Sequence, residues 1–96
     1  MMSGTEAIIT VEVSMYPLRE NYREAIDRFL EHLHRYSKLN LKVSETSTLV
    51  IGTYREVFSA LQTEIKRAQD RGQVSFVMKV LRGNLSEMQI RDYHAS

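Results

Sequence analysis

The 96-residue sequence has no cysteine and no tryptophan, a single proline and only four glycines. The lack of cysteine excludes disulfides, thiolate metal sites and cysteine nucleophiles. The few glycines form no Gly-rich phosphate loop, and neither a Ser-His-Asp order nor a kinase string is present. A chain of this length is expected to form one small domain.

The sequence also has no large excess of one charge sign, because its thirteen basic and twelve acidic residues leave a formal charge of +1. This balance gives no net attraction to nucleic acid or to an anionic membrane, so neither is expected as a partner. The N-terminus has no basic region, and the apolar run after it is short and alternating. It predicts neither a signal peptide nor a membrane span, and a cytoplasmic protein is the expectation.

Apolar periodicity predicts two strands separated by a helix in the first half of the chain. Residues 8–16 alternate with a period of two and are rich in β-branched side chains, which predicts a strand that Pro17 ends. Asn21 and Glu24 form a capping box for a helix whose apolar stripe runs to Tyr36. Residues 41–43 begin a second extended segment, and a turn is expected at residues 45–47.

The second half repeats this organisation. Residues 48–51 predict a third strand that Gly52 ends, and Thr53 and Glu56 form a second capping box. The following helix is expected to end at residues 70–72, with Gly72 as a left-handed cap. A fourth strand is predicted over residues 74–81 by alternation of apolar side chains.

The order β-α-β-β-α-β predicts a ferredoxin-like α+β sandwich, the split βαβ arrangement. Its antiparallel sheet would have the order 4-1-3-2, with two helices on one face. The domain is expected to span residues 1–83, followed by a C-terminal tail of uncertain structure at 84–96.

One face of the predicted sheet would be left without helices. The side expected under the helices carries Ile9, Val11, Val13, Met15, Phe76, Met78 and Val80. The open side is expected to carry Ile8, Thr10, Glu12, Ser14, Tyr16, Thr48, Val50, Val77 and Lys79. This mixture is too apolar to remain in water, so a ligand, a partner subunit or both should cover it.

Two strings carry the strongest chemical signal. The first is Glu-x-Ser-x-Tyr-Pro-Leu at residues 12–18, and the second is Ser-Thr-x-Val-x-Gly-x-Tyr at residues 47–54. Together they resemble the YkoF-like thiamine- and hydroxymethylpyrimidine-binding proteins, a superfamily that also contains the MTH1187-type domains. The resemblance runs from about residue 9 to residue 81.

The resemblance implies a ferredoxin-like binding protein rather than an enzyme, with thiamine or its hydroxymethylpyrimidine moiety as the ligand and no further cofactor. Some relatives hold two such repeats in one chain, so this single repeat is expected to form a homodimer or homotetramer through the sheets. The ligand-binding residues expected from the two strings are Glu12, Ser14, Tyr16, Ser47 and Thr48.

These side chains suit such a ligand. The Glu12 carboxylate can accept from the amino group of an aminopyrimidine or balance a thiazolium cation. The hydroxyls of Ser14, Ser47 and Thr48 can both donate and accept hydrogen bonds. Tyr16 offers an aromatic face, over which a cation gains about 0.5–2 kcal/mol.

Each of these residues also has an ordinary structural interpretation. Glu12 could pair with Lys79 on the neighbouring strand, Ser14 and Thr48 could bond on the sheet face, Tyr16 could cover an edge or interface, and Ser47 could be a turn residue. Lys66, Arg67 and Arg71 form a basic end to the second helix, which we interpret as a favourable interaction with the helix dipole rather than as phosphate binding. His32 and His34 are two residues apart on a helix and do not form a metal pair.

The other function classes open to this topology are an RNA-binding module, a ferredoxin-like enzyme and a self-assembly domain. An RNA-binding module of the same topology needs aromatic residues on its third strand, and residues 48–51 contain none. An acylphosphatase-like enzyme needs a phosphate loop after the first strand, where Arg19 has no accompanying glycines. A cofactorless monooxygenase has no strong motif to test. The main alternative is a self-assembly or regulatory domain without a small-molecule ligand, whose open face binds only its own copy.

Overall fold

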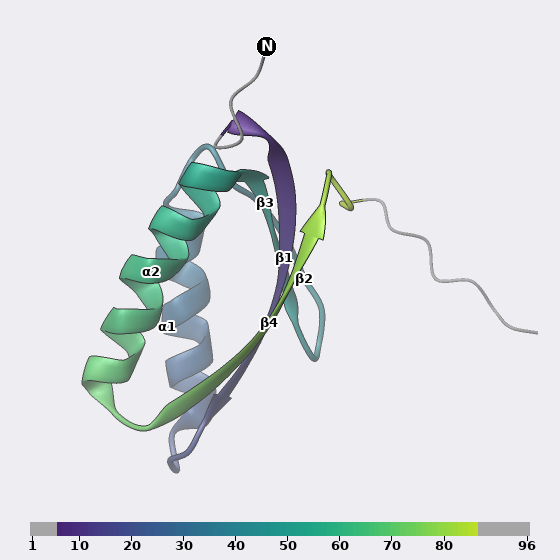
Figure 1. Ribbon diagram of the computed structural model, residues 1–96. Coiled ribbons are helices and arrows are strands. Elements are labelled where there is room, and N and C mark those ends of the chain that lie inside the picture. Colours follow the sequence, from purple (N-terminus) through teal and green to yellow (C-terminus); the bar gives the residue numbers. More distant parts are fainter. Residues whose placement is uncertain (1–5, 87–96) are drawn as a thin grey trace, which may run out of the picture.

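The computed structural model describes residues 6–86, which form a four-stranded sheet and two helices (Figure 1). The elements follow the order β-α-β-β-α-β, as the sequence predicts. They are β1 (Ile8–Pro17), α1 (Tyr22–His34), β2 (Asn40–Val43), β3 (Thr48–Thr53), α2 (Tyr54–Arg71) and β4 (Val74–Arg82).

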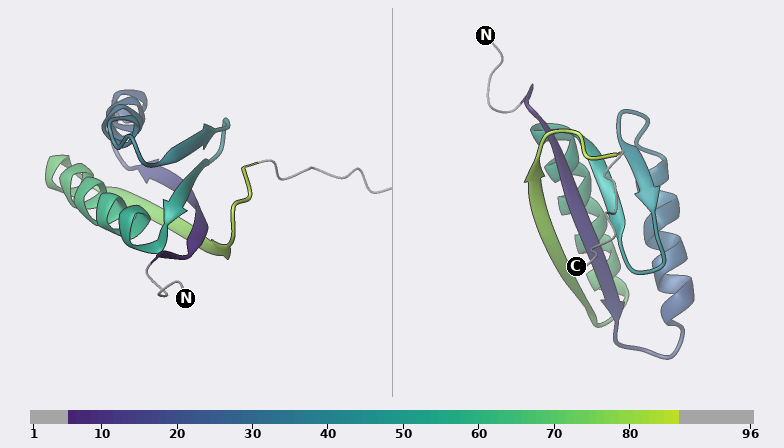
Figure 2. Two further views of the ribbon diagram at one scale, coloured as in Figure 1. Left: turned by 90° about the horizontal axis from the view of Figure 1, so that it is seen from above. Right: turned by 90° about the vertical axis from the view of Figure 1, so that its right-hand side faces the viewer.

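The sheet is antiparallel, with the strand order β2-β3-β1-β4. This is the predicted order 4-1-3-2, and both helices lie on one face of the sheet (Figures 1 and 2). The predicted ferredoxin-like α+β fold is therefore confirmed. β1 is central and pairs with β4 along nine positions, from Ile9 opposite Arg82 to Pro17 opposite Val74.

The core lies between the helices and the covered face of the sheet. Its largest fully buried apolar side chains are Leu33, Leu61, Val11, Val50 and Val57. The ring centroids of Phe29 on α1 and Phe76 on β4 are 5.2 Å apart, which joins the first helix to the edge strand. Fully burying one Leu or Val side chain contributes about 1.5–3 kcal/mol, so this cluster is a main source of stability.

Of the two capping boxes predicted at the helix N-termini, the one at α2 forms its side-chain bond and the one at α1 does not. The Thr53 hydroxyl accepts a 3.2 Å hydrogen bond from the amide of Glu56, and α2 begins at the next residue. The side chain of Asn21 makes no such bond, so the capping box predicted for α1 is wrong in its side-chain contact. Gly72 follows α2 with φ 157° and ψ −179°. This positive φ favours glycine, although the extended ψ differs from that of the predicted left-handed cap.

The register corrects the predicted faces of β3. Thr48 lies opposite Val13, and Val50 lies opposite Val11, on strands where paired residues share a face. Val11, Val13 and Val50 belong to the core under the helices. Thr48 and Val50 therefore lie on the helix side, and the prediction that they lie on the open face is wrong.

The helices also cover less of β4 than predicted. Met78 and Val80 were expected beneath them, yet these side chains are 41% and 53% exposed. β4 is an edge strand, with β1 as its one neighbour in the sheet. Its outer side therefore lacks the flanking side chains that bury a central strand.

Thr10 connects the open face of β1 to the residues that follow β4. Its hydroxyl donates a 2.8 Å hydrogen bond to the carbonyl of Gly83 and accepts one of 2.9 Å from the amide of Leu85. Thr10 is buried as a result. The chain beyond the predicted boundary at residue 83 thus stays in contact with the sheet as far as Leu85, and residues 87–96 of the predicted tail lie outside the described part of the chain.

Candidate functional site

Three of the five predicted ligand-binding residues lie on the open face of β1. The carboxylate of Glu12 lies 3.8 Å from the ammonium of Lys79 on β4, and its side chain is 29% exposed. Ser14 follows two residues along, and Tyr16 is 53% exposed at the end of the strand. A partly exposed pair at this distance contributes well under about 1 kcal/mol, so Glu12 is held weakly and its carboxylate can take another partner.

The other two predicted residues line a cavity on the opposite face of the sheet. Ser47 and Thr48 border a space of about 70 Å³ between α1 and the connection from β2 to β3. Its apolar wall is formed by Val13, Met15, Ile26, Phe29, Leu30 and Val43. Its polar rim is the connection itself, residues 44–48. We call this space the hairpin cavity.

The rim of the hairpin cavity is held by Ser44. The amide of Ser44 donates to the carbonyl of Ser47 at 2.9 Å, and its hydroxyl donates to the same carbonyl at 3.1 Å. The same hydroxyl accepts from the amide of Ser47 at 3.2 Å. These bonds confirm the predicted turn. They also leave the hydroxyls of Ser47 and Thr48 without a hydrogen bond to any other described residue.

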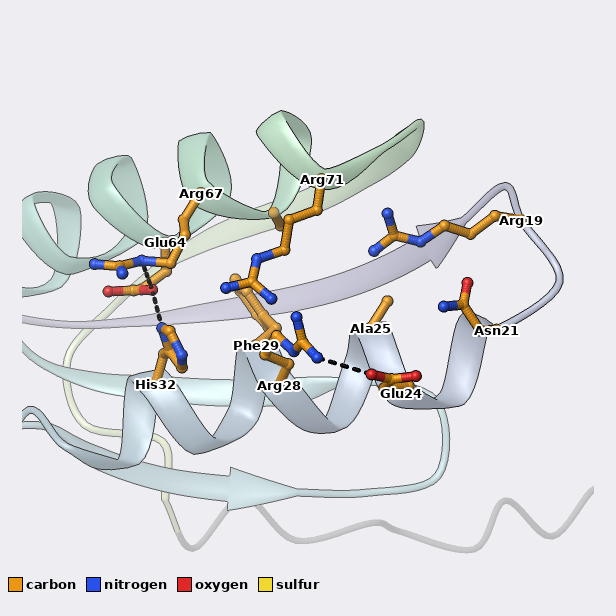
Figure 3. A pocket seen from close by; sticks show the side chains of 11 residues that line it. Arg19, Asn21, Glu24, Ala25, Arg28, Phe29, His32, Glu64, Arg67 and Arg71 are labelled. Atoms are coloured by element: carbon orange, nitrogen blue, oxygen red, sulfur yellow. Dashed lines mark hydrogen bonds and ion pairs between the residues drawn. The ribbon is translucent and has the colours of Figure 1, made fainter.

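A second and larger cavity lies between the two helices, at the start of α1 and the end of α2. Its volume is about 160 Å³, and it is lined by residues of both helices and of the connection from β1 to α1 (Figure 3). The basic residues that line it are Arg19, Arg28, Arg67 and Arg71. We call this space the helix cleft.

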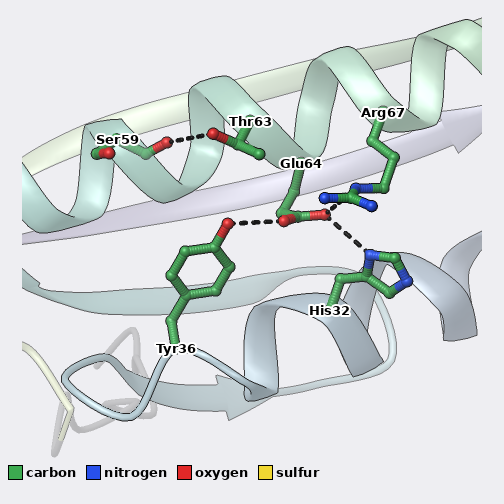
Figure 4. A network of polar contacts seen from close by, with 6 residues as sticks. All are labelled: His32, Tyr36, Ser59, Thr63, Glu64 and Arg67. Carbon is green, nitrogen blue, oxygen red and sulfur yellow. Dashed lines mark hydrogen bonds and ion pairs between the residues drawn. The ribbon is translucent and has the colours of Figure 1, made fainter.

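A buried carboxylate forms one end of the helix cleft. Glu64 on α2 is only 4% exposed and bonds to three groups (Figure 4). Its Oε1 lies 3.1 Å from both Nε of Arg67 and Nδ1 of His32, and its Oε2 accepts a 2.7 Å hydrogen bond from the hydroxyl of Tyr36. Burial, followed by the bond to Glu64, raises the pKa of Tyr36. This cluster joins the end of α1 to the middle of α2.

Nothing in the described residues suggests a metal centre or a membrane span. Residues 6–86 contain no group of three or more His, Asp or Glu side chains placed to hold a metal ion. None of the helices described is long and apolar enough to cross a membrane.

Residues 8–87 match the model of the YKOF-related family. The chain belongs to the YKOF-related family. The family resemblance that residues 12–18 and 47–54 predict is therefore confirmed. Among curated proteins, no relative matches.

Solved structures similar to this YKOF-related chain share its fold at low sequence identity. One is TM0486 of Thermotoga maritima, described as a "putative thiamine biosynthesis/salvage protein", with 19% identity and a TM-score of 0.70 over 79% of this chain and 84% of that one. Another is the hypothetical protein MJ1052 of Methanocaldococcus jannascii, with 18% identity and a TM-score of 0.71 over 88% and 89% of the two chains. A third is a domain of unknown function, DUF77, from Bacillus cereus, with 14% identity and a TM-score of 0.71 over 91% of each chain.

In this YKOF-related chain the five predicted residues thus form two groups on opposite faces of one sheet. Glu12, Ser14 and Tyr16 face outward, whereas Ser47 and Thr48 face the space beneath α1. Sequence reasoning missed the helix cleft, since Arg19 and Arg28 are far from Arg67 and Arg71 along the chain. It also missed Glu64, which sits among apolar positions of α2 at helical spacing and could have been found from that placement.

Proposed function

We propose that this protein reversibly binds thiamine or its hydroxymethylpyrimidine moiety without turnover. The family to which the chain belongs supports a ligand-binding role, and the name of the Thermotoga structure supports the ligand class. The structural observation that carries the proposal is the hairpin cavity, which combines an apolar wall with a rim of free hydroxyls. Ligand sites commonly pair an apolar lining with a few placed polar groups.

The pyrimidine ring is proposed to enter the hairpin cavity. The hydroxyls of Ser47 and Thr48 can donate to ring nitrogens and accept from the amino group, and the carboxylate of Glu45 at the rim can accept from the same amino group. A cavity of about 150 Å³ holds benzene. A space of about 70 Å³ therefore takes one edge of a six-membered ring, and the rest of the ligand would lie at the opening beside the rim.

The prediction that Glu12, Ser14 and Tyr16 contact the ligand stays a prediction, and it concerns the opposite face of the sheet. We propose that a second copy of the chain covers this face. Tyr16 and Val77 are each 53% exposed, and Val77 lies opposite Ser14 in the register, so β1 and β4 present apolar area on this face that a partner subunit would bury. The protein would then be a homodimer or homotetramer, as expected for a family member with a single repeat.

The experiment is a thermal-shift titration of the wild type with thiamine, thiamine phosphate and hydroxymethylpyrimidine. A ligand at 100 times its dissociation constant stabilises the folded state by about 2.7 kcal/mol, which raises the Tm of a domain of this size by several degrees. Thr48→Val removes one hydroxyl of the hairpin cavity, Glu12→Gln removes the carboxylate of the open face, and Thr63→Val is the control on the exposed side of α2.

A shift that Thr48→Val abolishes and Glu12→Gln retains supports the hairpin cavity. The reverse pattern would move the site to the open face and keep the function. If none of the three compounds shifts the Tm of a folded protein, the binding function is wrong, and the self-assembly domain becomes the better explanation of the exposed strands.

A further inference from the structure

The helix cleft gathers positive charge from three separate parts of the chain. Arg19 lies in the connection from β1 to α1, Arg28 lies on α1, and Arg67 and Arg71 lie on α2. Figure 3 shows that the side chains of Arg28 and Arg71 reach into the space between the helices from opposite sides, and that Arg19 reaches toward the same space.

Carboxylates neutralise only part of this charge. Arg28 pairs with Glu24 at 2.7 Å, and Arg67 pairs with the buried Glu64 at 3.1 Å. Arg19 and Arg71 form no ion pair with any residue in the described range 6–86. Four guanidinium groups against two carboxylates leave a surplus of two positive charges at this cavity. A phosphate dianion carries two negative charges and would balance this surplus.

Arg19 is held in place although one of its polar atoms lacks a partner. Its Nε is buried and makes no hydrogen bond within the described chain. Its guanidinium packs against Gly72, where a Cβ would collide with Nη1. A buried donor without a partner costs about 1–3 kcal/mol, so an acceptor that enters the cleft beside Arg19 would gain a preformed donor.

Two further features of the cleft favour an anion. Asn21 lines it, and its side chain is not used to cap α1, so the amide is available to a ligand. The first turn of α1 lies at the same end, and the amides of a helix N-terminus attract negative charge. The guanidinium groups themselves match the oxygens of a phosphate in bidentate geometry.

We propose that the helix cleft binds phosphate, either as the free ion or as the phosphate group of a small phosphomonoester. Arg19 and Arg71 supply the charge-assisted hydrogen bonds, and Arg28 and Asn21 complete the site. The cavity of about 160 Å³ exceeds what a phosphate group needs, and Ala25, Phe29 and Ala68 give it an apolar wall for an organic substituent. The helix cleft shares Phe29 with the hairpin cavity but is otherwise lined by different residues, and phosphate binding there does not depend on thiamine binding.

The test is an NMR titration of the isotopically labelled full chain at constant ionic strength. Inorganic phosphate and glycerol 3-phosphate are the probes, and glycerol is the uncharged counterpart. We expect the amide signals of residues 21–25 and 68–72 to move with both anions and not with glycerol. Saturation with glycerol 3-phosphate alone would assign the site to a phosphomonoester, whereas equal binding of both would assign it to the phosphate group itself.

Arg71→Gln is the decisive variant, because Arg71 is exposed at the end of α2 and its loss leaves the core unchanged. Binding should weaken by about tenfold or more, since a hydrogen bond to a charged group is lost. Arg23→Gln is the matched control, because it removes the same charge from the exposed face of α1 and should change the affinity by less than about twofold at physiological salt.

Arg19→Gln provides an independent check, and its folding is verified from the dispersion of the same spectrum. The proposal is overturned if neither anion moves these signals, or if Arg71→Gln and Arg19→Gln bind both anions as well as Arg23→Gln does. A protein that binds phosphate but responds to neither thiamine nor hydroxymethylpyrimidine would retain this site and lose the proposed function, so the two failures are distinguishable.

Discussion

The hydroxyl of Tyr36 donates a 2.7 Å hydrogen bond to Oε2 of Glu64, and this bond links the segment after α1 to the middle of α2. The other oxygen of the same carboxylate contacts His32 and Arg67. A carboxylate that is 4% exposed is stable in its charged form only when such partners surround it. The four side chains therefore hold the two helices in register over the sheet.

Glu64→Gln should destabilise the protein by about 1.5–3 kcal/mol, because it replaces charge-assisted hydrogen bonds by neutral ones and places an amide donor among donors. Urea denaturation followed by circular dichroism measures this change. Glu31→Gln is the control, since Glu31 is exposed on α1 and its substitution should cost less than about 0.5 kcal/mol. Equal stability of the two variants would mean that the cluster does not hold the helices together.

The raised pKa of Tyr36 predicts a loss of stability in alkali. The folded protein binds the phenol proton more tightly than the unfolded chain does, so this contribution is complete below about pH 10, the ordinary pKa of tyrosine, and is lost as the pH rises through the folded value. Tyr36→Phe should flatten the fall in unfolding free energy above pH 10. Parallel pH profiles for the wild type and Tyr36→Phe would contradict this.

Thr10→Val should release the residues after β4 from the sheet. The substitution keeps the shape of the side chain but removes the bonds to Gly83 and Leu85, and we expect a cost of about 1–3 kcal/mol because the Leu85 amide loses its acceptor. Hydrogen exchange at that amide should accelerate more than at the amides of β1. Thr63→Val, which removes a hydroxyl that donates to the carbonyl of Ser59 within α2, is the comparison.

Val77→Lys should weaken the association of two chains. Val77 is 53% exposed opposite Ser14 on the open face, and a lysine there would place a charge in the proposed interface. Sedimentation velocity should show a wild-type dimer or tetramer and a shift of Val77→Lys toward monomer. Val80→Lys changes an equally exposed valine of the same strand that lies opposite Val11 on the helix side, and it should leave the assembly intact. A wild type that is monomeric at all accessible concentrations would contradict the proposed self-association.

The fold was predictable because each strand and helix carries a local pattern of its own. The faces of β3 were not, since residues 48–51 contain apolar side chains in both phases of the alternation and a one-residue choice reverses the face. Val11 and Val13 set the choice through pairing with Val50 and Thr48, which only the register reveals. Because this register places Thr48 on the helix side, the five predicted ligand-binding residues fall on two faces of the sheet.

The cluster of arginines was outside the reach of sequence reasoning for a different reason. Near the end of α2, Arg67 and Arg71 have a sufficient local explanation in the helix dipole. The structure adds a second interpretation, because the β1–α1 connection brings Arg19 to the same cavity as Arg67 and Arg71. Gly72 leaves room there for the guanidinium of Arg19. Charge assembled from distant segments has no signature in any short window of sequence.

The central place of β1 has a consequence for the order in which the chain acquires its structure. β1 is the first strand in the sequence, yet one of its neighbours is the last, and the register joins Ile9 to Arg82. During synthesis, the backbone groups on that side of β1 must wait until almost all of the described chain has left the ribosome. Contacts of such long sequence separation slow folding, so the nascent chain spends this interval with its central strand half paired and in need of protection from aggregation.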